Sequence, residues 1–191
     1  MLVLTSGVAR AGTISYSGYF NDPANAALVW SDLLPARFGD DGEIANNVAL
    51  HGVTIVQAGP VTFESVGFAA GGADPYVTLF QGTGPGATVL GSNYAQAFST
   101  GGDFLLTFDL PAGGYTVAMG VFANMSIAEN LGSGTLGDGF TFLGAPSFLG
   151  NYYYELDIAY PDGPVPPIPE PATLLLIGSG MMGCFARRKK A

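Results

Sequence analysis

The stretch FLLTFDLPAGGYTVAMGV, Phe104 to Val121, decides the fold. Apolar residues alternate with others on both sides of a central Pro111–Gly114 segment, and side chains that alternate in this way lie on one face of a β-strand. Glycines in a short segment between two such strands favour a tight turn. The stretch therefore predicts two antiparallel strands joined as a hairpin.

The same alternation recurs along the chain before and after this stretch. Predicted strands lie at residues 14–20, 28–34, 48–57, 61–68, 76–80 and 152–160. A change in the parity of apolar residues near Glu64 and Ser65 predicts a β-bulge. Residues 124–148 are rich in glycine and aperiodic, which predicts a long loop.

About eight short strands with Gly- and Pro-containing turns, and no helical period before Ala172, predict an all-β fold. We expect a single antiparallel β-sandwich, jelly-roll-like, over residues 12–162. A short C-terminal transmembrane helix is expected to follow it.

Charge is unevenly distributed in the 191 residues, whose formal net charge is −9. Between Gly12 and Pro171 the only cation is Arg37, while all 15 acidic residues precede Ala172. A strongly negative surface opposes binding to nucleic acid or anionic membranes. It is compatible with divalent cations or with a secreted, soluble ectodomain.

The C-terminal tail has three parts in a fixed order. A proline-rich spacer, residues 163–171, contains Pro169, Glu170 and Pro171, and prolines keep such a segment extended. Residues 172–186 are mostly apolar and uncharged, as expected of a short transmembrane helix. The basic tail, residues 187–191, is a topology signal that stays in the cytoplasm. Its cations are Arg187, Arg188, Lys189 and Lys190.

This tail resembles the PEP-CTERM sorting signal of Gram-negative bacteria, in which a Pro-Glu-Pro motif precedes a short transmembrane helix and a basic end. The resemblance implies recognition by an exosortase, a membrane protease or transpeptidase that cuts near Pro169–Pro171. It also implies a precursor anchored in the inner membrane, whose ectodomain passes to the cell surface or the extracellular matrix. The alternatives are an ordinary tail anchor and a buried apolar helix.

Residues 1–11 are interpreted as the remnant of a secretory signal peptide. Ala9 and Ala11 flank Arg10 in a small-x-small cleavage pattern, so the mature protein would begin at Gly12. The basic segment that usually opens such a signal is missing. We expect that translation starts upstream; the alternative is an atypical signal.

A second resemblance rests on Asp74-Pro75-Tyr76-Val77-Thr78-Leu79-Phe80 and on Leu110-Pro111-Ala112-Gly113-Gly114-Tyr115-Thr116-Val117. These segments are similar to motifs of the bacterial pre-peptidase C-terminal domain, a jelly-roll accessory domain of secreted proteins. The resemblance implies an accessory role, and some members of that family bind calcium or polymers. The acidic pair that often follows the first motif is replaced here by Gly91-Ser92-Asn93-Tyr94.

The residue inventory disfavours an enzyme. His51 is the only histidine and lies in a strand pattern, so it is interpreted as structural. Cys184, the only cysteine, lies in the apolar tail and is interpreted as a small hydrophobic residue. The ectodomain lacks both a lysine and a Gly-x-Ser-x-Gly motif. No two carboxylates stand out as a glycosidase pair.

Two kinds of binding site remain. Asp40, Asp41 and Glu43 offer three carboxylates around a glycine, and Asp74 lies at another turn, so these are the weak candidates for a Ca²⁺ site. No other cofactor is expected. Tyr152, Tyr153 and Tyr154 alternate along a strand, so Tyr153 points away from the other two and is a candidate platform for sugar stacking.

Three functions follow from these observations. The leading one is a non-enzymatic, exosortase-sorted protein of the cell envelope or extracellular space, with a structural or adhesive role in a biofilm matrix of exopolysaccharide. The second is a glycan- or calcium-binding module tethered to the membrane. The third, disfavoured by the inventory, is a hydrolase.

Overall fold

The computed structural model describes residues 10–26, 47–94, 102–143 and 150–162. The chain divides into two compact units, and Ala11–Gly163 is the unit that holds nearly all the described residues. The predicted strand at 28–34, the tail from Gly163 and the first nine residues all lie outside the described part. Within that part, no helix has the length and apolar character that a membrane span requires.

Eight strands form the described unit, and most match the predicted ones. They are β1 (Arg10–Tyr19), β2 (Ala49–Ile55), β3 (Gly59–Ser65), β4 (Tyr76–Gln81), β5 (Thr88–Ser92), β6 (Leu105–Leu110), β7 (Gly113–Gly120) and β8 (Tyr153–Asp162). The helices are short: α1 (Pro23–Ala26), α2 (Ile127–Leu131), and the 3₁₀ turns η1 (Phe68–Ala70), η2 (Phe122–Asn124) and η3 (Leu136–Asp138).

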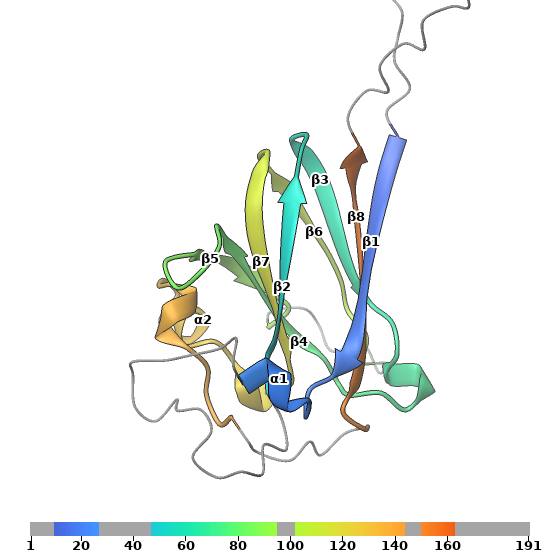
Figure 1. The fold of residues 1–191 in the computed structure, drawn as a ribbon, viewed down its shortest axis with the longest axis vertical. Coiled ribbons are helices and arrows are strands. Elements are labelled where there is room, and N and C mark those ends of the chain that lie inside the picture. The colour runs from blue at the N-terminus through green and yellow to red at the C-terminus, as the bar shows by residue number, and fades with distance from the viewer. Residues whose placement is uncertain (1–9, 27–46, 95–101, 144–149, 163–191) are drawn as a thin grey trace, which may run out of the picture. The chain divides into compact units, whose positions relative to one another are not determined.

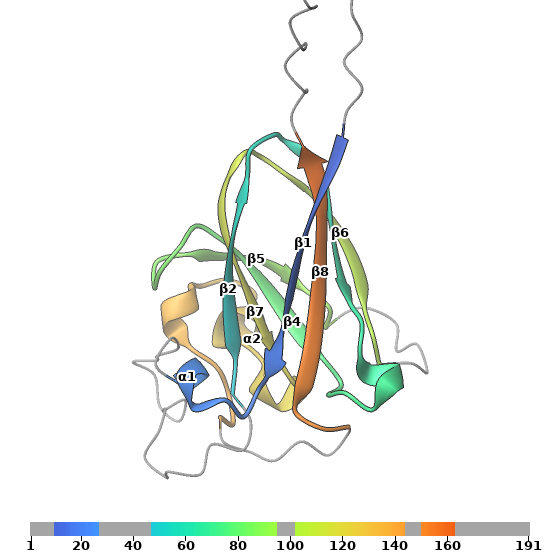
Figure 2. The same cartoon turned by 45° about the vertical axis from the view of Figure 1, so that its right-hand side comes forward.

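The strands form two four-stranded sheets that pack face to face (Figure 1, Figure 2). Sheet A has the order β1-β8-β3-β6, and sheet B has the order β2-β7-β4-β5. Neighbouring strands pair as β1·β8, β2·β7, β3·β6 and β4·β5. The same pairs occur when one long hairpin, with β4 and β5 at its tip, is rolled into a barrel-like sandwich. This is the jelly-roll topology, so the predicted all-β sandwich is confirmed. The transmembrane helix predicted to follow it lies outside the described residues.

The hairpin predicted from Phe104–Val121 is wrong. Both strands form, but β6 pairs with β3 in sheet A, whereas β7 pairs with β2 and β4 in sheet B. The Pro111–Ala112 connection therefore crosses from one sheet to the other. The β2–β3 connection, residues 56–58, crosses beside it, because Ile55 pairs with Gly113 and Gly59 pairs with Leu110.

The predicted bulge near Glu64 and Ser65 is also wrong. Sheet A keeps an unbroken register through β3, with Val61, Phe63 and Ser65 all buried on the inner side. The change of parity arises because the strand ends at Ser65 and the chain turns into η1. A register shift occurs elsewhere, between Leu79 and Phe80, where β4 pairs with β5.

The main core lies between the sheets and is built from the inward residues of the alternating pattern. Its largest fully buried side chains include Phe20, Phe63, Tyr115, Met119 and Leu156. Burial of such side chains contributes roughly 1.5–3 kcal/mol each.

A second apolar cluster lies on the outer side of sheet B. Phe80 and Ala118 of that sheet pack there against Ala128 of α2, Leu136 of η3 and Phe140. The segment predicted as a loop therefore supplies short helices that cover sheet B. The outer side of sheet A is the open face, in the sense that no described segment covers it.

Candidate functional site

The outer side of sheet A is formed partly by β1 and β8, which join the two ends of the described unit. The Phe20 N–H donates to the Tyr152 carbonyl oxygen over 2.8 Å, and the Ser15 hydroxyl donates to Asp157. Both contacts fit one antiparallel register, in which Tyr19 faces Tyr153. Tyr154, Leu156 and Ile158 point into the core, so Tyr153, Glu155 and Asp157 point outward.

Gly18 of β1 leaves room for the Tyr154 side chain of β8. A Cβ atom at Gly18 would lie 2.8 Å from the Tyr154 hydroxyl oxygen, a separation that side chains do not tolerate. The absence of a side chain at Gly18 thus accommodates the inward Tyr154 ring and leaves Tyr19 and Tyr153 together on the other face.

Tyr19 and Tyr153 form an aromatic pair on this open face. Their ring centroids are 5.6 Å apart, with an interplanar angle of 63°, and Tyr19 is 57% exposed. The Tyr153 hydroxyl donates to Glu155 Oε2 over 2.8 Å, and the backbone N–H of Tyr153 donates to Asn151 Oδ1 over 2.7 Å. This hydrogen bond places the phenol beside the carboxylate, and it raises the pKa of the Tyr153 phenol.

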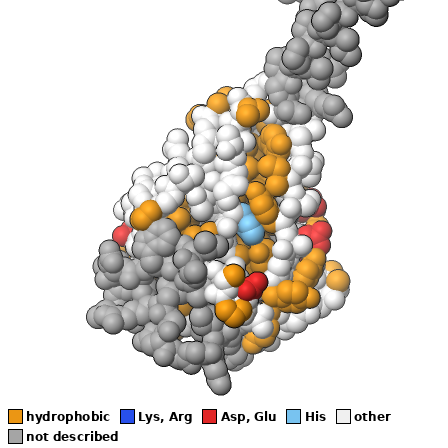
Figure 3. Space-filling view, in the orientation of Figure 1, with side chains coloured by type: hydrophobic (Ala, Val, Ile, Leu, Met, Phe, Trp, Pro, Cys, Tyr) orange, Lys and Arg blue, Asp and Glu red, His pale blue; other side chains and the backbone are white. Residues whose placement is uncertain are grey.

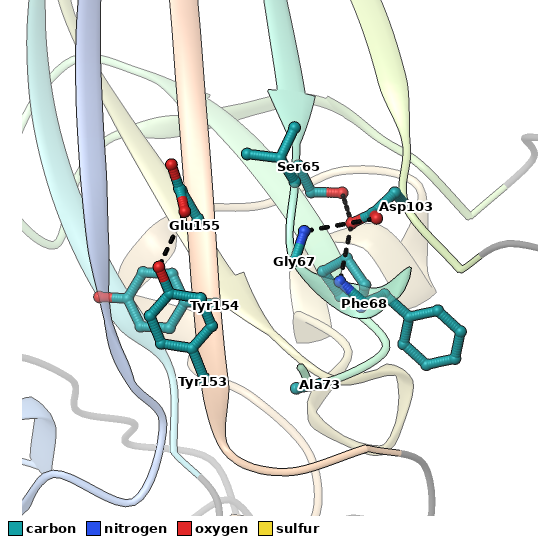
Figure 4. Close-up of a pocket in the computed structure, with 10 residues that line it drawn as sticks. Ser65, Gly67, Phe68, Ala73, Asp103, Tyr153, Tyr154 and Glu155 are labelled. Carbon is teal, nitrogen blue, oxygen red and sulfur yellow. Dashed lines mark hydrogen bonds between the residues drawn. The ribbon is translucent and has the colours of Figure 1, made fainter. Parts of the chain in front are cut away.

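A shallow hollow adjoins this pair, between β8, the end of β3 and η1 (Figure 4). Asp103 lies at its side and accepts hydrogen bonds from the Ser65 hydroxyl at 3.0 Å and from the N–H groups of Gly67 and Phe68 at 3.4 Å. Ser65 in turn accepts from the Phe104 N–H at 2.8 Å. These bonds explain why Ser65 is buried, and they assign Asp103 to holding the η1 turn in place.

Gly67 brings this turn against the aromatic pair. Its φ is +152°, a conformation that side chains rarely adopt, and a Cβ atom there would lie 3.5 Å from the Tyr153 ring. The turn thus supports one side of the Tyr153 ring.

His51 lies where β1 and β2 border each other at one edge of the sandwich, in a stripe of apolar side chains (Figure 3). Its ring stacks on Tyr16, with centroids 4.3 Å apart, and its Nε2 lies 3.1 Å from the Tyr154 hydroxyl. Burial lowers the pKa of His51 from 6.5 to about 4, so the ring is neutral at pH 7. These contacts agree with the structural role expected of His51. Burial, with a smaller effect of Asp22, raises the pKa of Tyr154 to about 12.

Most of the residues singled out in the tail and the acidic loop lie outside the described part of the chain. These are Ala9, Asp40, Asp41, Glu43, Pro169, Glu170, Pro171, Arg187, Arg188, Lys189 and Lys190. Ala11 lies in β1, so cleavage after it would remove the first two residues of that strand.

Asp74 is the one described member of the calcium candidates. It lies in the turn before β4, and its pKa is raised by burial and by the nearby charge of Asp103. The described residues contain no group of three or more His, Cys, Asp or Glu side chains that could hold a metal ion. The Ca²⁺ site stays a prediction.

The alternation along residues 152–160 predicted an outward Tyr153, but neither its partner Tyr19 nor the carboxylate Glu155 was predicted as part of a site. The alternation along β1 places Tyr19 among the outward-facing residues, so the sequence did indicate that its side chain is exposed. The pairing of β1 with β8 was not readable, because well over a hundred residues separate the two strands.

Comparison with known families identifies the tail. Residues 167–190 match the family model described as the PEP-CTERM protein-sorting motif. The tail is a PEP-CTERM motif. The resemblance of the tail to the PEP-CTERM sorting signal is therefore confirmed. This motif places the chain with exosortase substrates, which are exported precursors processed to the cell surface. No comparison confirms the resemblance of the ectodomain to the pre-peptidase C-terminal domain.

The other comparisons add little beyond the PEP-CTERM motif. No curated protein matches the chain. The structure is similar to the crystal structure of Aeromonas hydrophila PliG, a periplasmic lysozyme inhibitor of g-type lysozyme. The sequence identity is 11%, the TM-score is 0.30, and the match covers 85% of this chain and 93% of that chain.

Proposed function

We propose that this PEP-CTERM protein has a structural or adhesive role in the exopolysaccharide matrix outside the cell. The single observation that carries the proposal is the sorting motif at residues 167–190, which delivers the jelly-roll unit to the surface. The open outer side of sheet A, with its paired tyrosines, supports the proposal because it offers a contact surface that no described segment covers.

The proposed role is binding rather than catalysis. His51 is engaged by Tyr16 and Tyr154, and Asp103 is engaged by three donors of its own chain. These groups therefore serve the fold. A negative ectodomain also suits a molecule that stays dispersed among hydrated polymers.

Matrix retention tests this role. We expect the protein from a biofilm-forming host with an exosortase to fractionate with the extracted matrix. In a matched strain that makes no exopolysaccharide, the same protein should shift to the culture medium. The role is contradicted if the protein is equally free in the medium of both strains while the exosortase still processes it.

The tethered binding module is the second candidate, and the Tyr19–Tyr153 pair favours its glycan-binding form. For the calcium-binding form, the test is a shift of the melting temperature on adding Ca²⁺, because a ligand bound only by the native state raises its stability.

A further inference from the structure

We propose that Tyr19, Tyr153 and Glu155 form a binding site for a neutral polysaccharide, with pyranose rings packed on the tyrosines. This inference rests on the proposed function and specifies its partner. The three side chains project from β1 and β8 onto the same face, next to the hollow shown in Figure 4.

The two rings supply the apolar contact that a sugar requires. A pyranose ring carries C–H groups on its faces and hydroxyl groups around its edge, so a tyrosine matches it with an apolar ring and a polar hydroxyl. Tyr19 is more than half exposed, and its ring meets that of Tyr153 at 63°. The pair therefore forms a corner, in which one ring packs on a sugar face and the other contacts the edge.

Glu155 supplies the directional contact. Its Oε2 accepts the hydrogen bond from Tyr153, which fixes the carboxylate beside the ring. A carboxylate has about four acceptor positions, so Glu155 can also accept from sugar hydroxyl groups. Ser17, two residues before Tyr19 on the same strand face, adds a hydroxyl that donates and accepts.

The charge of this face selects a neutral polymer. Glu64 of β3 and Asp157 of β8 lie opposite each other on the outer side of sheet A. Asp109 of β6 is also exposed on this side of the sheet. Arg10, at the start of β1, is the only Lys or Arg in the described residues. An anionic polysaccharide would be repelled by this face, whereas a neutral one is not.

The site is also held in place before any ligand arrives. The Phe20–Tyr152 backbone bond and the Ser15–Asp157 bond tie β1 to β8. Asn151 holds the backbone of Tyr153, and Gly67 packs beside its ring. Side chains fixed on regular strands lose little freedom on binding, which favours affinity.

Affinity electrophoresis tests the site. The full chain, in a zwitterionic detergent without a sugar headgroup, is run through gels that contain a neutral β-glucan, galactomannan or dextran, and through gels that contain anionic alginate. We expect retardation by at least one neutral polymer and none by alginate. Tyr19→Ala and Tyr153→Ala should each weaken the apparent affinity by about tenfold or more. Glu155→Gln should weaken it less.

Tyr94→Ala is the matched control, because Tyr94 is also 57% exposed but follows β5 of the other sheet. It should bind as the wild type does, and thermal melting should show that each variant is folded. The inference is overturned if no neutral polymer retards the protein, if alginate retards it more, or if the folded Tyr19→Ala and Tyr153→Ala variants bind normally. Matrix retention of a protein that binds none of the neutral polymers would leave the proposed function standing and remove only this site.

Discussion

A disulfide formed by Thr62→Cys with Thr107→Cys should stabilise the ectodomain by about 2–4 kcal/mol. These residues are paired in register between β3 and β6, and their side-chain oxygens lie 3.1 Å apart on the outer side of sheet A. The geometry suits the short separation of Cβ atoms that a disulfide requires. The bond would close a loop of about 45 residues, for which the chain-entropy model gives about 4 kcal/mol.

The measurement is thermal melting with and without a reducing agent, with an expected rise in Tm of roughly 5–15 °C that reduction abolishes. Thr107→Cys with Ala118→Cys is the matched control. A four-residue hairpin loop at Pro111–Gly114 would place these two residues opposite each other, whereas the jelly roll places them in different sheets. Spontaneous oxidation of the control pair, with none in the first pair, would contradict the topology.

Acidification from pH 7 to pH 5 should destabilise the ectodomain through His51, by about 2 kcal/mol or a Tm loss of about 4–8 °C. The pKa of His51 is about 4 when folded, against 6.5 for an ordinary histidine. As the pH falls through 6.5, the unfolded chain therefore binds a proton that the folded chain does not bind. The free energy of unfolding decreases over this window and levels off once the pH falls below about 4.

His51→Gln tests this prediction, because glutamine cannot be protonated and still offers a hydrogen bond to Tyr154. His51→Phe, which keeps a ring for Tyr16, is the second variant. Both should melt at nearly the same temperature at pH 7 and pH 5. Asp74 acts in the opposite sense at lower pH, since its raised pKa favours protonation in the folded state. Equal pH dependence in wild type and variants would show that His51 has no such role.

Periodicity predicted the strands well but not all of their partners. The alternation in Phe104–Val121 reports which side chains face the core, and that is the same whether β6 and β7 pair or lie in opposite sheets. Glycine and proline in the connection also serve both arrangements. In the rolled hairpin of a jelly roll, β1 to β4 form one half and β5 to β8 form the other half. Because β6 and β7 belong to the same half, each pairs with strands of the other half.

Two other errors have local causes. Ser65 interrupts the apolar pattern of β3, yet it is buried, because Asp103 and Phe104 satisfy its hydroxyl. The cover of sheet B was missed because its helices are too short to show a period. Its start was readable, since Ser126 caps α2 by accepting from the N–H of Glu129, three residues on.

Only the part of the candidate site that lies on a single strand could be predicted from the sequence. The parity of β8 placed Tyr153 on the outside, and the structure agrees. Tyr19 and the hollow beside η1 depend on pairing between strands at opposite ends of the unit, and a single sequence carries no direct signal of such pairing. The tail was predictable because its motif is contiguous and needs no folded neighbour.

The most direct test of the account is the location and length of the protein in a host with an exosortase, beside a Glu170→Ala variant. The account predicts that the wild type appears outside the cell, shortened by about the length of the tail, and that the variant stays at full length in the membrane. If both proteins stay uncut in the inner membrane, the tail acts only as an anchor, and the claim that sorting delivers this jelly roll to the matrix is contradicted.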